Sequence, residues 1–119
     1  MIIRELEKKD VSEIESIYDL YWSGNFRKNL SKRLQQYVEH SSETIEQDFH
    51  YFIAEENNEV VGVSAFRKVL GHMIGYTSTN KPAEFYISAV KYKGKGIGTA
   101  LRSKRIEEAK KLGKKIIEQ

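Results

Sequence analysis

The stretch YKGKGIGTAL, residues 92–101, places three glycines at alternate positions directly before a run with helical periodicity. Glycine destabilises a helix by about 1 kcal/mol relative to alanine, so glycines at a helix start need a physical reason. The first N–H groups of a helix have no partner inside the helix, and the helix dipole makes that end partly positive. Glycines let an anion approach these groups closely, and Lys93 and Lys95 add positive charge. The stretch therefore predicts a phosphate-binding loop; the alternative is a tight strand-to-helix turn with solubilising lysines.

The segments on either side of these glycines complete a strand–loop–helix–strand unit. Residues 83–90, AEFYISAV, favour a β-strand because they are rich in aromatic and β-branched side chains. Residues 98–112 favour a helix with one apolar stripe, and the final KKIIEQ favours the start of a further strand. The residues of this helix expected to face the core are Ala100, Leu101, Ile106, Ala109 and Leu112.

The earlier part of the chain predicts a strand, two helices and a hairpin. Residues 1–6 favour a short strand, and apolar stripes at helical spacing follow between residues 11 and 38. Asp10 is expected to be the N-cap of the first helix, with Glu13 completing a capping box. Two β-rich runs around residues 56–59 then indicate a hairpin.

The predicted element order, β-α-α-β-β-β-α-β, is that of one α/β domain over residues 1–119, a mixed sheet with helices on both faces. The sequence has no cysteine, which excludes a cysteine nucleophile, a disulfide framework and a thiolate zinc site, and no metal site is expected. The first eight residues are already charged and no long apolar run follows, so we expect no signal peptide, no membrane span and a cytoplasmic location. The net charge of +3 is only mildly basic, and Glu107 and Glu108 interrupt the Lys- and Arg-rich stretch 91–115, so nucleic acid is not the expected partner.

The glycine spacing does not fit two common phosphate loops. The dinucleotide fingerprint G-x-G-x-x-G fails, because its sixth position is Thr99 counted from Gly94 and Leu101 counted from Gly96, and no Gly-Lys-Ser/Thr of a P-loop occurs. Residues 93–98, KGKGIG, resemble the [RQ]-x-x-G-x-[GA] loop of the GCN5-related N-acetyltransferase (GNAT) family, with lysine in place of arginine or glutamine. The predicted order of elements is also similar to that family.

The resemblance implies that the loop binds the pyrophosphate of coenzyme A through its backbone amides. The residues that it assigns to this role are Lys93, Gly94, Lys95, Gly96, Ile97 and Gly98. In the preceding strand, Ser88, Ala89 and Val90 are expected to separate from the neighbouring strand and to pair with the amides of the pantetheine arm. The implied activity is direct transfer of an acetyl group from acetyl-CoA to a small-molecule or peptide amine. The alternative is a coenzyme A-binding or interaction module with the same fold and no catalysis.

An amine must be neutral to attack a thioester, so a general base is expected beside the acceptor. The resemblance assigns this role to Glu84, at the start of the strand before the loop; the alternative is a solvated carboxylate at a strand end. His72, in a loop, and His50 are further candidate bases. Glu55 and Glu56 are expected to be charges at the tip of the hairpin.

The family forms part of its acceptor side from the first two helices and the loop between them. Trp22 lies off the apolar stripe and is expected to line this side, with Phe26 nearby, whereas Tyr21 lies on the stripe and is expected in the core. In the helix after the glycines, Arg102 is expected within reach of the 3′-phosphate of coenzyme A, and Arg105 on the solvated face.

The C-terminal end is where the sequence departs from the family pattern. The family continues after the last predicted strand with a helix and two strands, often with a tyrosine that acts as general acid toward the thiolate. The sequence stops at Gln119, which leaves a predicted strand with an unpaired edge. Three explanations stay open: a truncated chain, a second subunit that covers the edge in a homodimer, or a vestigial site.

Overall fold

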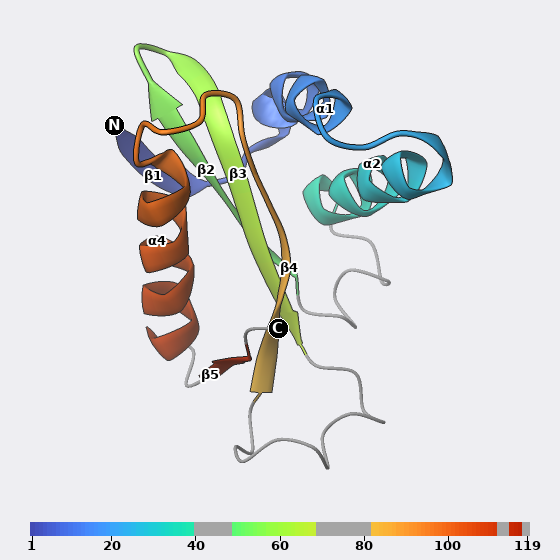
Figure 1. Cartoon of the computed structure of the whole chain (residues 1–119). Coiled ribbons are helices and arrows are strands. Elements are labelled where there is room, and N and C mark those ends of the chain that lie inside the picture. The colour runs from blue at the N-terminus through green and yellow to red at the C-terminus, as the bar shows by residue number, and fades with distance from the viewer. Residues whose placement is uncertain (40–48, 69–81, 112–114, 118–119) are drawn as a thin grey trace.

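The computed structural model describes residues 1–39, 49–68, 82–111 and 115–117. The strands in these ranges are β1 (Ile2–Glu5), β2 (His50–Glu56), β3 (Glu59–Lys68), β4 (Pro82–Val90) and β5 (Lys115–Ile117). They form one mixed sheet in the order β1–β2–β3–β4–β5 (Figure 1). Neighbouring strands from β1 to β4 run antiparallel, and β5 runs parallel to β4.

The helices are a 3-10 turn, η1 (Lys8–Asp10), and the α-helices α1 (Val11–Asp19), α2 (Gly24–Val38) and α4 (Ile97–Lys111). Figure 1 shows α1 and α2 on one face of the sheet and α4 on the other. The predicted order β-α-α-β-β-β-α-β, with helices on both faces, is confirmed. The helix expected over residues 98–112 begins one residue earlier, and residue 112 lies outside the described residues.

Hydrophobic cores lie on both faces of the sheet, and β3 contributes to each. Val63 and Ala65 belong to the core under α1 and α2, whereas Phe66 belongs to the core under α4. Alternate side chains of a strand point to opposite faces, so an apolar run such as VVGVSAF indicates a strand covered on both sides. The core under α1 and α2 contains Leu6, Ile14, Ile17, Tyr18, Leu30, Leu34, Phe49, Tyr51, Ile53, Val60, Val63, Ala65, Ile87 and Ala89. The core under α4 contains Phe52, Ala54, Val61, Phe66, Ile97, Leu101 and Ala109.

The hairpin predicted around residues 56–59 joins β2 to β3. Its two turn residues, Asn57 and Asn58, have φ angles of 52° and 63°. Asparagine tolerates this left-handed region better than most residues, and such turns match the twist of the flanking strands. The hairpin prediction is therefore confirmed.

The start of α1 differs from the predicted capping box. Asp10 makes no side-chain cap to α1; its carboxylate accepts the Glu7 N–H at 2.8 Å and two hydrogen bonds from Arg4, each at 2.9 Å. Glu13 accepts the N–H of Val60 at 2.9 Å and so links α1 to β3. Asp10 is at the N-cap position of α1, as predicted, but the predicted capping box is wrong because other donors near in space bind both carboxylates.

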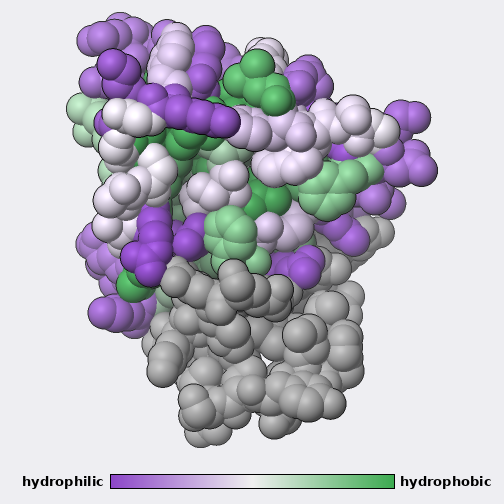
Figure 2. All heavy atoms as spheres, viewed as in Figure 1, coloured by the Kyte–Doolittle hydropathy of each residue, from purple (hydrophilic) through white to green (hydrophobic). Residues whose placement is uncertain are grey.

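The surface mixes apolar and polar side chains. On the face seen in Figure 2, hydrophobic side chains reach the surface in small areas between hydrophilic ones. The large apolar side chains exposed in the described residues are Met1, Ile2, Leu20, Tyr21, Phe26, Phe85 and Tyr92. Leu20, Tyr21 and Phe26 all lie where α1 gives way to α2, so this junction exposes an unusual share of them.

Candidate active site

The glycine loop, defined here as residues 91–96, joins β4 to α4. Gly94 and Gly96 have φ angles of 75° and 76°, in the left-handed region that favours glycine. A Cβ atom built on either glycine would meet no atom within 4 Å. Glycine is therefore favoured at these two positions by the backbone conformation, and the space beside them is open. Gly98 differs, because it lies in the first turn of α4 and a Cβ there would make an ordinary contact with Val90 at 3.8 Å.

The loop ends at the N-terminus of α4. The Gly96 carbonyl accepts the Ala100 N–H at 3.1 Å, which closes the first turn of the helix. The N–H groups of residues 97–99 therefore have no acceptor within the helix, as at any helix start. They sit at the positive end of a 15-residue helix, beside glycines and the exposed Lys93 and Lys95. This combination suits an anion such as a phosphate.

A glycine that the sequence reasoning missed holds this helix start against the sheet. A Cβ atom on Gly62 in β3 would lie 2.8 Å from both Ile97 Cγ2 and Leu101 Cδ1, and 3.3 Å from the Ala89 carbonyl oxygen. Real Cβ atoms do not approach so closely, so a side chain at position 62 would force Ile97 and Leu101 to shift. The available signal was a single glycine inside the β-rich run VVGVSAF, which often marks a close approach.

The beginning of the loop is tied to the β2–β3 hairpin. The Lys91 N–H donates to the Val61 carbonyl at 2.8 Å. The Glu59 carboxylate accepts hydrogen bonds from Lys91 Nζ at 2.6 Å and from the Tyr92 hydroxyl at 2.8 Å. These two hydrogen bonds lower the pKa of Glu59. Lys91 is thus engaged with Glu59, whereas the Lys93 ammonium lies 5.7 Å from the ring centroid of Tyr21.

The edge of β4 that faces away from β3 pairs with β5 only at residues 82–84. From residue 85 to residue 90, no described strand lies along this outer edge. Residues of an antiparallel strand alternate between bonding to their neighbour and pointing away from it. Because Lys91 bonds to β3, and Ala89 lies opposite Val63, the backbone groups of Ser88 and Val90 point to the outer edge. Of the three residues expected to pair with pantetheine, Ser88 and Val90 thus face the outer edge and Ala89 faces β3.

A β-bulge interrupts β4 in its middle. Ala65 lies opposite Ile87 and Phe66 opposite Phe85, which leaves Tyr86 as the extra residue. Tyr86 therefore shares the α1–α2 face with Ile87 and contacts Phe49, with ring centroids 4.8 Å apart. A bulge re-aims the backbone groups around it, and bulges are frequent beside active sites.

The structure describes the three candidate bases in different detail. Glu84 is located by its backbone, which lies opposite Arg67 in β3 and Ile117 in β5, at the last β4–β5 pair among the described residues. Its side chain lies outside the described part of the structure, as does the whole of His72. His50 is half-buried and stacks on Phe66, with ring centroids 4.8 Å apart.

The junction of α1 and α2 places Tyr21 differently from the prediction. Tyr21 was expected in the core, but it is 38% exposed and its hydroxyl donates to the Val90 carbonyl at 2.6 Å. The prediction is wrong because α1 ends at Asp19, so Tyr21 no longer follows the helical stripe. Trp22 is half-buried against the core under α1 and α2, between Tyr21 at 5.6 Å and Phe26 at 6.0 Å by ring centroids.

The two arginines of α4 lie on different faces. Arg102 is exposed, in the second turn from the glycine loop. Arg105 was expected on the solvated face, but it is 4% exposed. Its guanidinium donates to the Ser64 hydroxyl at 3.0 Å and lies 4.3 Å from the ring centroid of Phe85. The prediction is wrong because position 105 shares the buried face of α4 with residues 97, 101 and 109.

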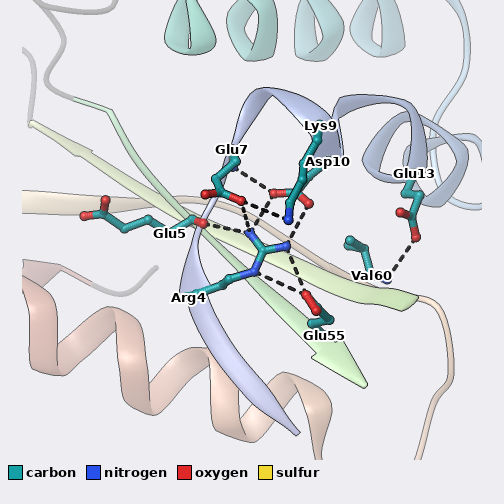
Figure 3. Close-up of polar contacts among 8 residues, drawn as sticks. All are labelled: Arg4, Glu5, Glu7, Lys9, Asp10, Glu13, Glu55 and Val60. Carbon is teal, nitrogen blue, oxygen red and sulfur yellow. Dashed lines mark hydrogen bonds and ion pairs between the residues drawn. The ribbon is translucent and has the colours of Figure 1, made fainter. Parts of the chain in front are cut away.

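A group of charged side chains at the other end of α1 forms a second polar region, the Arg4 cluster, made of Arg4, Glu7, Asp10 and Glu55 (Figure 3). The Arg4 guanidinium bonds both carboxylate oxygens of the buried Asp10 at 2.9 Å and reaches Glu55 at 3.1 Å. Burial alone would raise the pKa of Asp10, but hydrogen bonds from Arg4 and the Glu7 N–H outweigh it and hold that pKa below its usual value. Glu55 is thus a partner of Arg4 rather than a charge at the hairpin tip.

Two further observations bear on the class of site. The described residues contain no group of three or more His, Asp or Glu side chains that could hold a metal ion. Within the same residues, no helix has the length and apolar character needed to span a membrane.

Comparison with known proteins identifies the family. The family model for the acetyltransferase (GNAT) family matches residues 13–119, which include the strand, glycine loop and helix described above. The chain belongs to the GNAT acetyltransferase family. No curated protein matches the sequence. The family match confirms the resemblance that the sequence KGKGIG indicated.

Solved structures of acetyltransferases share the fold of this GNAT protein. An aminoglycoside 6′-N-acetyltransferase from Acinetobacter haemolyticus has a TM-score of 0.75 and 14% identity, over 100% of this chain and 79% of that chain. An acetyltransferase from Clostridium acetobutylicum, solved with acetyl-CoA, has a TM-score of 0.71 and 20% identity, over 99% and 79%. A GNAT protein from Desulfovibrio desulfuricans has a TM-score of 0.79 and 13% identity, over 98% and 71%. At such identities the likeness concerns the fold.

Proposed function

We propose that this GNAT protein transfers an acetyl group from acetyl-CoA directly to an amine. The observation that carries the proposal is the position of the glycine loop. It leads into the N-terminus of α4 and directly follows the end of β4, whose outer edge is described above. The phosphate site and the part of the β4 edge that no described strand pairs then follow one another along a single path, on which the Val90 carbonyl accepts the Tyr21 hydroxyl. That path suits a ligand with phosphates at one end and amides along its arm, as in coenzyme A.

In this proposal the protein holds coenzyme A mainly through its backbone. The N–H groups of residues 93–98 bind the pyrophosphate, supported by the open space beside Gly94 and Gly96. Lysine serves a phosphate as a point charge, so Lys93 can stand where the family has arginine or glutamine. Ser88 and Val90 pair with the amides of the pantetheine arm, because their backbone groups point to the outer edge.

The chemistry assigned to the chain is acid–base and electrostatic. Acetyl-CoA would supply the activated acetyl thioester: the amine nitrogen forms a bond to the acetyl carbon, the C–S bond breaks, and coenzyme A leaves as a thiolate that takes a proton from solvent. A backbone N–H on the outer edge of β4 donates to the thioester carbonyl and stabilises the negative charge that develops there. Glu84 takes the proton that the acceptor amine loses, and its place beside the part of the β4 edge that no described strand pairs supports this role.

The acceptor is an amine of a small molecule or a peptide. Its binding site is lined on one side by the α1–α2 junction, with Trp22 and Phe26. Aminoglycoside acetyltransferases among the structural neighbours support the amine class. A homodimer would be formed through an edge of the sheet, where β1 and β5 are the outermost described strands.

The test is binding followed by transfer. Isothermal calorimetry with acetyl-CoA and with coenzyme A is expected to give saturable heat at micromolar to millimolar ligand. Incubation with acetyl-CoA and a panel of aminoglycosides, polyamines and peptides is then expected to release free thiol with at least one amine. No heat and no thermal shift at millimolar ligand would refute the proposal. Binding without transfer to any amine would favour the non-catalytic coenzyme A-binding module.

A further inference from the structure

Tyr21 connects the α1–α2 junction to the proposed coenzyme A path. Its hydroxyl donates to the Val90 carbonyl at 2.6 Å, although the two residues are 69 positions apart. On the other side, the Lys93 ammonium lies 5.7 Å from the centroid of its ring. The ring therefore lies close both to the end of the outer edge of β4 and to the glycine loop.

The Val90 carbonyl is one of the backbone groups that point to the outer edge. Under the proposed function, an amide N–H of the pantetheine arm binds at this edge, so Tyr21 and the ligand need the same acceptor. A carbonyl oxygen has two lone pairs, but the Tyr21 hydroxyl oxygen, 2.6 Å from the Val90 carbonyl oxygen, crowds the approach of a second donor. Binding of the ligand at this carbonyl therefore competes with the Tyr21 hydroxyl.

We propose that Tyr21 is a latch that coenzyme A opens, an inference that rests on the proposed function. In the free protein the hydroxyl occupies the Val90 carbonyl and holds the α1–α2 junction against β4. When coenzyme A binds, the hydroxyl is displaced and Lys93 turns from the ring toward the phosphates. Tyr21 packs on Trp22 at 5.6 Å, and Trp22 packs on Phe26 at 6.0 Å. Displacement of the latch therefore moves the aromatic side chains on the acceptor side.

The latch has two measurable consequences. The first is that it opposes coenzyme A binding, so its removal tightens binding. A single neutral hydrogen bond is worth about 0.5–1.5 kcal/mol, so Tyr21→Phe is expected to bind coenzyme A about 2- to 10-fold more tightly than the wild type. The second is that binding changes the surroundings of Trp22, which is the one tryptophan of the sequence. Its fluorescence therefore reports the junction without any label.

The experiment titrates coenzyme A into the wild type, Tyr21→Phe and a control, Tyr37→Phe, by calorimetry and by Trp22 fluorescence. Tyr37 also packs against the sheet, with its ring centroid 4.8 Å from that of Tyr51, but it lies between α2 and β2, away from the glycine loop. The expected result is tighter binding only in Tyr21→Phe. The wild type and the control should show a fluorescence change with the same midpoint as the heat. In Tyr21→Phe that change should be smaller, because the junction is already released.

Three outcomes overturn the latch. Unchanged or weaker binding in Tyr21→Phe, with normal heat in the wild type, refutes it and leaves the proposed function standing. Binding heat without a change in Trp22 fluorescence in the wild type also refutes the latch and leaves the proposed function standing. This outcome does not depend on the folding of any variant. Absence of heat in all proteins refutes the proposed function together with the latch.

Discussion

The Arg4 cluster and the glycine loop are both polar regions, but their polar groups have different partners. In the Arg4 cluster, charged side chains bind one another, with Arg4 held between Asp10 at 2.9 Å and Glu55 at 3.1 Å. In the glycine loop, the N–H groups at the start of α4 have no acceptor within the helix, and the space beside Gly94 and Gly96 is open. The first region joins β1, η1 and β2, whereas the second leaves its groups available for a ligand.

This difference teaches where a site can be sought in such a fold. A carboxylate with a shifted pKa, such as Asp10, is often a mark of a functional site. Here its shift has a structural cause, because Arg4 and the Glu7 N–H complete its hydrogen bonds inside the protein. The better mark is a set of backbone donors at a helix start, with glycines that leave them accessible.

The largest effect is expected from Gly96→Glu, which places a bulky negative charge among the proposed phosphate donors. We expect coenzyme A affinity to fall by about 100-fold or more, since repulsion replaces attraction at the helix N-terminus. Calorimetry measures the affinity, and circular dichroism verifies the fold. Gly96→Asn is the control, because asparagine adopts a positive φ and is neutral. Equal losses in both variants would mean that backbone strain, not charge, causes the effect.

A smaller effect, on stability alone, is expected from Asp10→Asn in the Arg4 cluster. Removing the charge leaves Arg4 poorly compensated, and we expect a loss of about 2 kcal/mol in the free energy of unfolding. Urea denaturation measures this loss, and coenzyme A affinity should stay at the wild-type value. The control is Glu107→Gln, which removes an exposed partner of Lys111 and should change stability by less than about 0.5 kcal/mol.

The ion pair of Arg4 and Asp10 also predicts how stability depends on pH. Because the folded-state pKa of Asp10 is lowered, its contribution is present above its unfolded-state pKa, about 3.9, and is lost as pH falls through the lower folded-state value. Asp10→Asn should therefore lose less stability than the wild type between about pH 5 and pH 2. Parallel acid limbs in the two proteins would contradict the assignment of this ion pair.

The smallest effect is expected from Gly62→Ala, which acts on the loop through packing. The added methyl group meets Ile97 and Leu101, so we expect a loss of about 1–2 kcal/mol in stability and a weakening of coenzyme A binding well below that of Gly96→Glu. Combining it with Leu101→Ala should give a smaller loss than the sum of the single changes. Additive losses would show that the contact with Leu101 does not set the position of α4.

The order of elements and the glycine loop could be predicted because their signals are local. Apolar spacing of 3.6 or 2 residues marks each helix and strand, and the glycines at 94 and 96 lie directly before the helix that they open. The family resemblance rested on this short stretch and on the predicted order of elements.

The features that were missed depend on partners far along the chain. Tyr21 was predicted in the core but bonds to Val90, and Glu13 was predicted in a cap but bonds to Val60. Arg105 was predicted on the solvated face but bonds to Ser64. The bulge at Tyr86 likewise depends on how β4 aligns with β3. Spacing within α4 does place Arg105 on the buried face with Leu101 and Ala109. No spacing within one segment identifies the partners themselves, because tertiary packing decides which of several possible partners a side chain takes.

The most direct test of the central claim is an amide NMR titration of the 15N-labelled chain with coenzyme A. If backbone groups form the site, the largest saturable shifts should fall on the N–H groups of Gly96, Ile97 and Gly98, and then on Ser88 and Val90. The amides of the Arg4 cluster should move little. Largest shifts in the Arg4 cluster, or no saturable shift in the glycine loop at millimolar coenzyme A, would contradict the claim.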